Sequence, residues 1–152
     1  MQKTIRIPGQ RARLLALAAC VLTLALPAAG LAADGAAAKK EKVVFQVSDA
    51  DPKKWNLTLN NAKNVQADLG RDRTEVEIVA YGPGIGMLTA DSEVGNRIEE
   101  ALASGVRVVA CENTMKAQKL KRDDMLKGVG FVPAGVVELM KKQQEGYAYI
   151  RP

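Results

Sequence analysis

The chain has 152 residues, which is enough for one domain with a sizeable core. Its 22 basic and 17 acidic residues give a formal charge of +5, and it contains two cysteines and no histidine. Histidine metal sites and histidine-based catalytic triads are therefore excluded.

Residues 1–32 have the three regions of a cleavable secretory signal peptide. Four cations and no acidic residue form a positive start, and Leu14 to Leu26 is apolar apart from Thr23. Pro27 breaks this run, and small residues follow as far as Ala32, near which we expect cleavage. The apolar run is shorter than the roughly 20 residues that span a bilayer, so we favour a signal peptide over a retained anchor.

Cys20 follows a short pattern that is similar to the lipid-modification site of bacterial lipoproteins. A lipoprotein signal has its apolar stretch before the cysteine, whereas most of this stretch follows Cys20. We therefore interpret Cys20 as an ordinary residue of the signal and expect no lipid anchor. Cleavage near Ala32 would release the protein to the periplasm or the exterior with a single cysteine, which excludes an intrachain disulfide.

Loss of the signal also changes the charge. Residues 1–32 hold four of the basic residues and none of the acidic ones. The mature chain therefore has 18 basic and 17 acidic residues and a formal charge of +1. A nearly neutral chain lacks the basic surface that phosphate backbones require. We expect no nucleic-acid partner and, after processing, no membrane contact.

Residues 33–42 are rich in alanine and lysine and lack an apolar period, so we expect a flexible tether. The folded domain is expected over residues 43–152, where β-branched runs alternate with helical spacing. The predicted strands are residues 43–47, 74–81, 106–111, 129–132 and 147–150. The predicted helices are residues 51–69, 91–104, 114–120 and 133–145.

This alternation is typical of a parallel sheet with helices on both faces. We predict an α/β fold of the flavodoxin-like or Rossmann-like class, a three-layer sandwich with a five-stranded, mainly parallel sheet. Ligands of such sheets bind beyond the carboxyl ends of the strands. Three segments lie at those ends: residues 48–51, 82–86 and 111–114.

Cys111 lies where the third predicted strand passes into a helix. The free N–H groups and the dipole of a helix start favour a thiolate. Asn113 and Thr114 would present backbone N–H groups to the sulfur, and Lys116 would add positive charge. The residues support two interpretations of Cys111 about equally. It is either a nucleophilic thiol of low pKa or a buried structural cysteine, which is common for this residue type.

A second candidate site is a crevice formed by Asp49, Asn60, Gly82, Gly84 and Gly86. Consecutive backbone N–H groups of the glycine segment could hold an anion or another small ligand. The segment lacks the spacing of dinucleotide-binding loops and the lysine of a P-loop. We therefore favour a tight turn between strand and helix over an anion site.

Three stretches, residues 81–85, 106–115 and 131–139, together with the ending 146–150, resemble the DsrE/DsrF-like superfamily. The resemblance covers residues 43–152. It implies a flavodoxin-like sheet and homo- or hetero-oligomers, often trimers or hexamers. In the sulfur-relay members, a cysteine at the end of the third strand accepts sulfur as a persulfide and hands it on, and Cys111 matches that position.

The resemblance leads us to expect a periplasmic, sulfurtransferase-like sulfur carrier that accepts sulfane sulfur on Cys111 without a metal or cofactor. Its expected partners are further copies of the chain and either small sulfur species or proteins that donate and accept sulfur. The first alternative is a non-catalytic ligand-binding or assembly module in which Cys111 is structural. The second is a redox sensor that forms intermolecular disulfides through Cys111.

Overall fold

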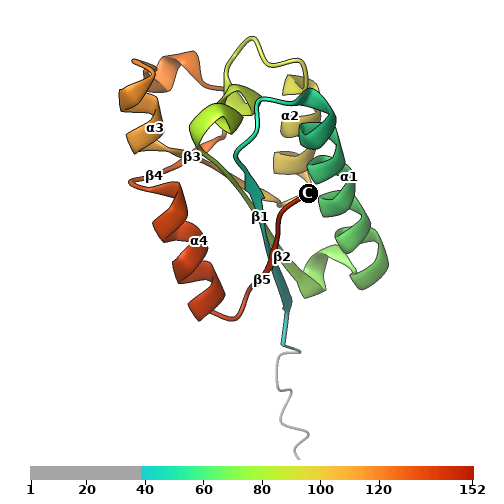
Figure 1. Cartoon of the computed structure of the whole chain (residues 1–152). Coiled ribbons are helices and arrows are strands. Elements are labelled where there is room, and N and C mark those ends of the chain that lie inside the picture. The colour runs from blue at the N-terminus through green and yellow to red at the C-terminus, as the bar shows by residue number, and fades with distance from the viewer. Residues whose placement is uncertain (1–38) are drawn as a thin grey trace, which may run out of the picture. The chain divides into compact units, whose positions relative to one another are not determined.

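A computed structural model describes residues 39–152; the predicted signal peptide and most of the predicted tether lie outside them. The strands are β1 (Glu41–Val47), β2 (Thr74–Ala80), β3 (Arg107–Cys111), β4 (Gly130–Val132) and β5 (Ala148–Ile150). The helices are α1 (Pro52–Leu69), α2 (Gly95–Ala103), α3 (Glu112–Ala117) and α4 (Gly135–Gln144) (Figure 1). The 3₁₀ turns are η1 (Arg71–Arg73), η2 (Gly82–Leu88) and η3 (Arg122–Asp124). None of the helices described is long and apolar enough to cross a membrane.

The predicted strands and helices are present, with shifts at several ends. β1 begins at Glu41 instead of residue 43, and α2 begins at Gly95 instead of near residue 91. The later start of α2 has a tertiary cause, because Thr89 pairs with Met125 in an isolated antiparallel bridge that holds the segment before the helix in an extended form. The segment predicted as a loop, residues 82–86, is wound into η2.

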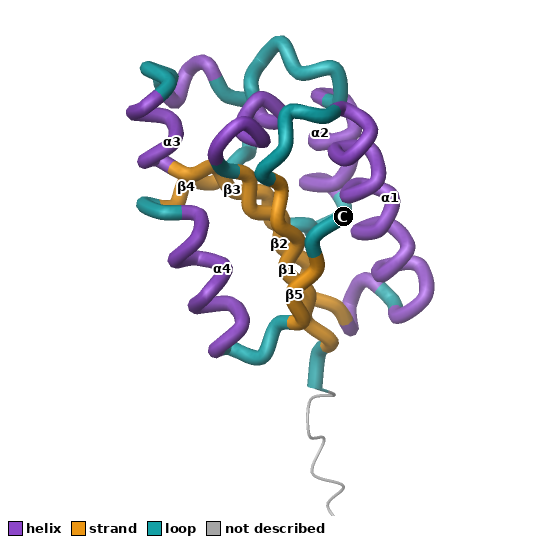
Figure 2. The backbone as a smooth tube through the Cα atoms, in the orientation of Figure 1, coloured by secondary structure: helices purple, strands orange, loops and turns teal. Residues whose placement is uncertain are grey.

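The sheet has the strand order β4-β3-β2-β1-β5, and every neighbouring pair is parallel. The first four strands follow one another across the sheet, while β5 returns to the free side of β1. Right-handed crossovers in one direction place α1 and α2 on one face, and the return crossover places α4 on the other (Figure 2). The predicted three-layer α/β sandwich with a five-stranded parallel sheet is confirmed.

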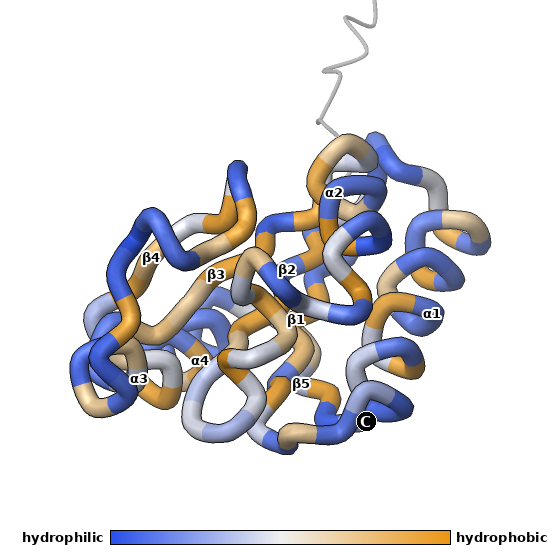
Figure 3. Tube along the Cα trace, turned by 90° about the horizontal axis from the view of Figure 1, so that it is seen from above, coloured by the Kyte–Doolittle hydropathy of each residue, from blue (hydrophilic) through white to orange (hydrophobic). Residues whose placement is uncertain are grey.

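The two faces of the sheet carry cores of different size. The α1–α2 face holds the larger core, which includes Phe45, Ile78 and Ile98, all with no exposed surface. In Figure 3, α1 alternates between hydrophilic and hydrophobic segments, as a helix does when one side packs on a sheet. The α4 face holds a smaller core of Val44, Val79, Val109, Val132 and Leu139.

A carboxylate is buried in the α4 face. Glu77 of β2 is 1% exposed, and neither of its side-chain oxygens accepts a hydrogen bond within the described residues. Two cations approach it, Arg107 Nε at 3.5 Å and Lys142 Nζ at 3.8 Å, and the carboxylate of Glu138 adds a like charge nearby. Burial, opposed by these cations and supported by Glu138, raises the pKa of Glu77 to about 7.

Candidate functional site

Cys111 is the last residue of β3 and immediately precedes α3, so its side chain lies at the carboxyl edge of the sheet. It pairs with Val132 of β4 in the sheet register and is 5% exposed. The strand fixes its backbone in an extended conformation, with φ −78° and ψ 113°. The position therefore combines an ordered backbone with very little exposure of the residue to solvent.

Two helices begin beside this sulfur. α3 follows Cys111 directly, and α4 begins at Gly135, soon after the neighbouring strand β4. The backbone N–H of Asn113 also donates to the carbonyl of Pro133 at 3.2 Å, which joins the two helix starts. The contribution of α4 could not be predicted from the residues around Cys111, because it depends on β4 lying next to β3.

The surroundings of Cys111 favour its thiolate. Burial raises the pKa of the thiol, but hydrogen bonding from the Thr114 hydroxyl and from the backbone N–H groups of Gly135 and Thr114 lowers it below the usual value. The N–H of Asn113, which was also expected to face the sulfur, donates to Pro133 instead. The Cys111 side chain makes no helix N-cap hydrogen bond. A charged thiolate accepts hydrogen bonds more strongly than a thiol, so N–H and O–H groups beside the sulfur favour the charged form. The site can therefore hold a negatively charged sulfur out of bulk water.

The Thr114 hydroxyl is oriented by the glycine segment. The backbone N–H of Gly82 donates to Thr114 Oγ1 at 2.9 Å, and the side-chain amide of Gln118 donates to the carbonyl of Gly82 at 3.2 Å. Since the hydroxyl oxygen accepts from Gly82, its own hydrogen is free to point at Cys111. Gly82, predicted for the second candidate site, thus supports the first.

Replacing Thr114 with valine is expected to slow alkylation of Cys111 at pH 7 about tenfold, the effect of losing one hydrogen bond to a charged group. The rate of reaction with iodoacetamide, measured as a function of pH, reports the thiolate fraction directly. Thr114→Ser keeps the hydroxyl and is the matched control. Equal pH profiles for the valine and serine variants would show that the hydroxyl does not act on the sulfur.

The basic residues near Cys111 are not among the main groups that lower the pKa of its thiol. Lys116 lies exposed near the end of α3, and the main influences on the pKa of Cys111 come from other groups. Arg122 of η3 forms an ion pair with Glu112, and its guanidinium lies 4.4 Å from the centre of the Phe131 ring. These contacts hold the segment after α3 against β4.

Asp49 and Asn60, two residues of the second predicted site, are engaged in other contacts. Asp49 forms ion pairs with Lys54 at 3.1 Å and Arg151 at 3.5 Å, whereas Asn60 accepts a hydrogen bond from Arg97 of α2. The glycine segment packs against the protein instead of opening to a ligand. A Cβ on Gly84 would lie 2.5 Å from the carbonyl oxygen of Val47, and one on Gly86 would lie 3.4 Å from the Trp55 ring.

The DsrE/DsrF-like family model matches residues 41–152, which span the whole sheet and the Cys111 site. The chain belongs to the DsrE/DsrF-like family. No group of three metal-ligating side chains occurs in the part of this family member that the structure describes. Comparison with curated proteins gives no match.

Solved structures support the family fold. MTH1491 from Methanobacterium thermoautotrophicum, a protein of unknown function, is 39% identical, with a TM-score of 0.71 over 74% of this chain and 100% of its own. The ychN protein from E. coli is 14% identical, with a TM-score of 0.61 over 74% of this chain and 99% of its own. BT1422 from Bacteroides thetaiotaomicron, a conserved protein of unknown function, is 18% identical, with a TM-score of 0.60 over 74% and 95%. At these identities the last two show the shared fold alone.

Proposed function

We propose that the protein is an exported sulfur carrier that holds sulfane sulfur as a persulfide on Cys111. The observation that carries the proposal is the position of Cys111 at the end of β3, where α3 begins directly after it and α4 begins after the neighbouring strand. Hydroxyl and N–H groups there lower the pKa of the thiol in spite of its burial. Membership of a family that includes sulfur-relay proteins suggests the chemistry. The signal-like residues 1–32 support a periplasmic or secreted location.

The carrier step needs no external oxidant. The Cys111 thiolate attacks the terminal sulfur of an inorganic polysulfide and forms a new S–S bond. The S–S bond next to that sulfur breaks, and the shortened polysulfide leaves with the electron pair. A second thiolate, from an acceptor protein or a small thiol, then attacks the outer sulfur of the persulfide and releases Cys111 as a thiolate.

The same hydrogen-bond donors suit both the thiolate and the persulfide form of Cys111. A persulfide anion carries its charge on the outer sulfur, so the Thr114 hydroxyl and the N–H groups at the starts of α3 and α4 can continue to stabilise it. The narrow opening over Cys111, which is 5% exposed, limits contact with bulky oxidants. These features suit a site that stores reactive sulfur and releases it to a docked thiol, within a homo-oligomer of three or six chains.

Burial also supports a second candidate function. A cysteine that is 5% exposed suits packing, so the protein could be a binding or assembly module in which Cys111 is structural. Intermolecular disulfides of a redox sensor are less compatible with this burial, because a second sulfur must come into bonding contact with Cys111.

Intact mass spectrometry after treatment with polysulfide tests the carrier proposal. We expect a gain of about one sulfur atom (~32 Da), reversed by reductant, since a persulfide exchanges with thiols. Cys111→Ser should show no gain, and Thr114→Ser should load like the original protein. Absence of the adduct, under conditions that load a model peptide thiol, would overturn the carrier and favour the structural module.

A further inference from the structure

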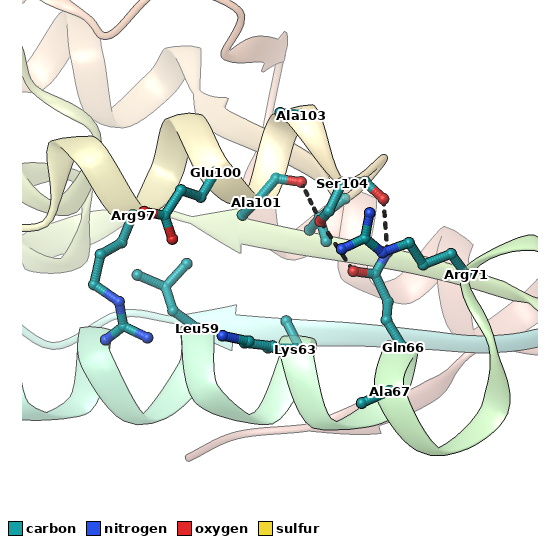
Figure 4. Close-up of a pocket in the computed structure, with 12 residues that line it drawn as sticks. Leu59, Lys63, Gln66, Ala67, Arg71, Arg97, Glu100, Ala101, Ala103 and Ser104 are labelled. Atoms are coloured by element: carbon teal, nitrogen blue, oxygen red, sulfur yellow. Dashed lines mark hydrogen bonds between the residues drawn. The ribbon is translucent and has the colours of Figure 1, made fainter.

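A groove of about 440 Å³ runs between α1 and α2 (Figure 4). Its volume falls within the roughly 300–1,000 Å³ of small-molecule sites. Leu59, Ala62 and Val106 lie beneath it and are at most 4% exposed, and its more exposed apolar lining is Ala67, Ala101 and Ala103. The groove lies on the α1–α2 face, and Val106 precedes β3, at the opposite end of that strand from Cys111. The proposed sulfur chemistry therefore makes no use of it.

The charged residues of the groove are mostly cations. Lys63, Arg71 and Arg97 line it together with one carboxylate, Glu100. Within residues 39–152, no ion pair involves any of these three cations. Their charge is left uncompensated, in contrast to the paired cations Lys142 and Arg107 on the other face of the sheet.

Arg97 is positioned without being neutralised. Its guanidinium donates to the side-chain oxygen of Asn56 and to that of Asn60, the latter at 2.7 Å. Both partners are uncharged amides on α1. They therefore hold the Arg97 side chain across the space between α2 and α1 and leave its positive charge unneutralised. These contacts also give a structural role to two of the asparagines on α1.

The polar groups in the middle of the groove are already satisfied. The Gln66 amide donates to the carbonyl of Ser104 at 3.0 Å, and the Ser104 hydroxyl donates to Gln66 Oε1 at 2.9 Å. This reciprocal pair, drawn in Figure 4, links α1 to the end of α2. A ligand in the groove thus finds apolar side chains along its length and cations at the rim, with few free hydrogen-bond partners between them.

We propose that this groove binds an elongated organic anion with an apolar body, such as a medium-chain carboxylate. The hydrocarbon would lie along Ala67, Ala101 and Ala103, and the carboxylate would bind Lys63 or Arg71. α1 lines the groove over residues 59–67, roughly 12 Å at 1.5 Å per residue, which suits an extended alkyl chain.

Calorimetric titration of the full chain with decanoate, below its micelle concentration, tests the proposal. Decyltrimethylammonium, with the same tail and the opposite charge, is the comparison probe. We expect decanoate to bind and the cation not to bind. Lys63→Gln combined with Arg71→Gln should weaken decanoate binding about tenfold or more. Lys53→Gln, which removes an exposed lysine of α1 outside the groove, should change nothing.

Two further variants test whether decanoate occupies the groove itself. Ala67→Trp, at an exposed position of the lining, should fill the groove and abolish binding while the protein stays folded. Cys111→Ser should bind decanoate normally, since the groove is independent of the sulfur site. Equal binding of both probes, or full binding by the Lys63 and Arg71 double variant, would overturn the proposal. So would a dimer that Ala67→Trp dissociates, because a second copy would then occupy the groove.

Discussion

Replacing Gly84 with alanine is expected to destabilise the domain by about 3 kcal/mol or more. The added Cβ would lie 2.5 Å from the carbonyl oxygen of Val47 and 2.9 Å from the Cα of Ser48, so it meets backbone and not a movable side chain. Either η2 or the end of β1 must shift to accommodate it. Urea unfolding followed by circular dichroism measures the loss.

Gly95→Ala is the matched control for this clash. Gly95 opens α2, and a Cβ there would meet only the side chain of Leu126, at 3.5 Å. Because alanine is the better helix former, this variant is expected to equal or exceed the original stability. Comparable unfolding curves for the two variants would show that η2 is free to move away from β1.

The clash at Gly84 should also lower the reactivity of Cys111. Gly82 starts the same 3₁₀ turn and donates its N–H to Thr114 Oγ1. A displaced turn loosens that bond and with it the orientation of the hydroxyl toward Cys111. Any Gly84→Ala protein that folds is therefore expected to alkylate more slowly at pH 7 than the original protein.

Glu77→Gln is expected to remove a large pH dependence of stability. Burial raises the pKa of Glu77 from 4.5 to about 7 in the folded state. Below pH 4.5 both states hold the proton; between that value and about 7 the unfolded chain loses it while the folded protein keeps it. The free energy of unfolding therefore falls as pH rises through this window, by about 3 kcal/mol for this group.

Urea unfolding at pH 5 and pH 8 measures this effect. Relative to the original protein, Glu77→Gln should gain about 2 to 3 kcal/mol on going from pH 5 to pH 8, because glutamine has no proton to release. Glu145→Gln is the control: Glu145 also pairs with Lys142, at 2.8 Å, but it is half-exposed and its pKa is lowered, so it titrates below this window. Parallel pH dependence in the original protein and Glu77→Gln would contradict the assignment.

The sequence predicts the layers of this fold because each element carries its own signal. β-branched runs mark the strands, and α1 shows Pro52 at its first position and Gly70 directly after its end. The start of α2 cannot be located in this way, because the segment before it is held by a bridge to Met125, a residue far along the chain. Propensity and periodicity carry no information about such long-range contacts.

The candidate site could be predicted only as far as it is local. Cys111, Asn113 and Thr114 are neighbours along the chain, and the strand-to-helix boundary brings them together. The start of α4 at Gly135 lies near Cys111 because β4 pairs with β3, and the burial of Glu77 depends on α4 crossing its face of the sheet. Both facts follow from strand order and crossover direction, which no short motif encodes.

The position of β5 affects how the chain can fold. β1 pairs with β5 through residues 43 and 148, so the first and last strands of the domain are neighbours. Until Ala148–Ile150 are available, one side of β1 remains an open edge, able to pair with another chain. The sheet is therefore completed by its most distant contact, which slows folding relative to local pairing. A growing chain thus stays incompletely folded until its final segment has been synthesised, and the three residues of β5 then close the edge.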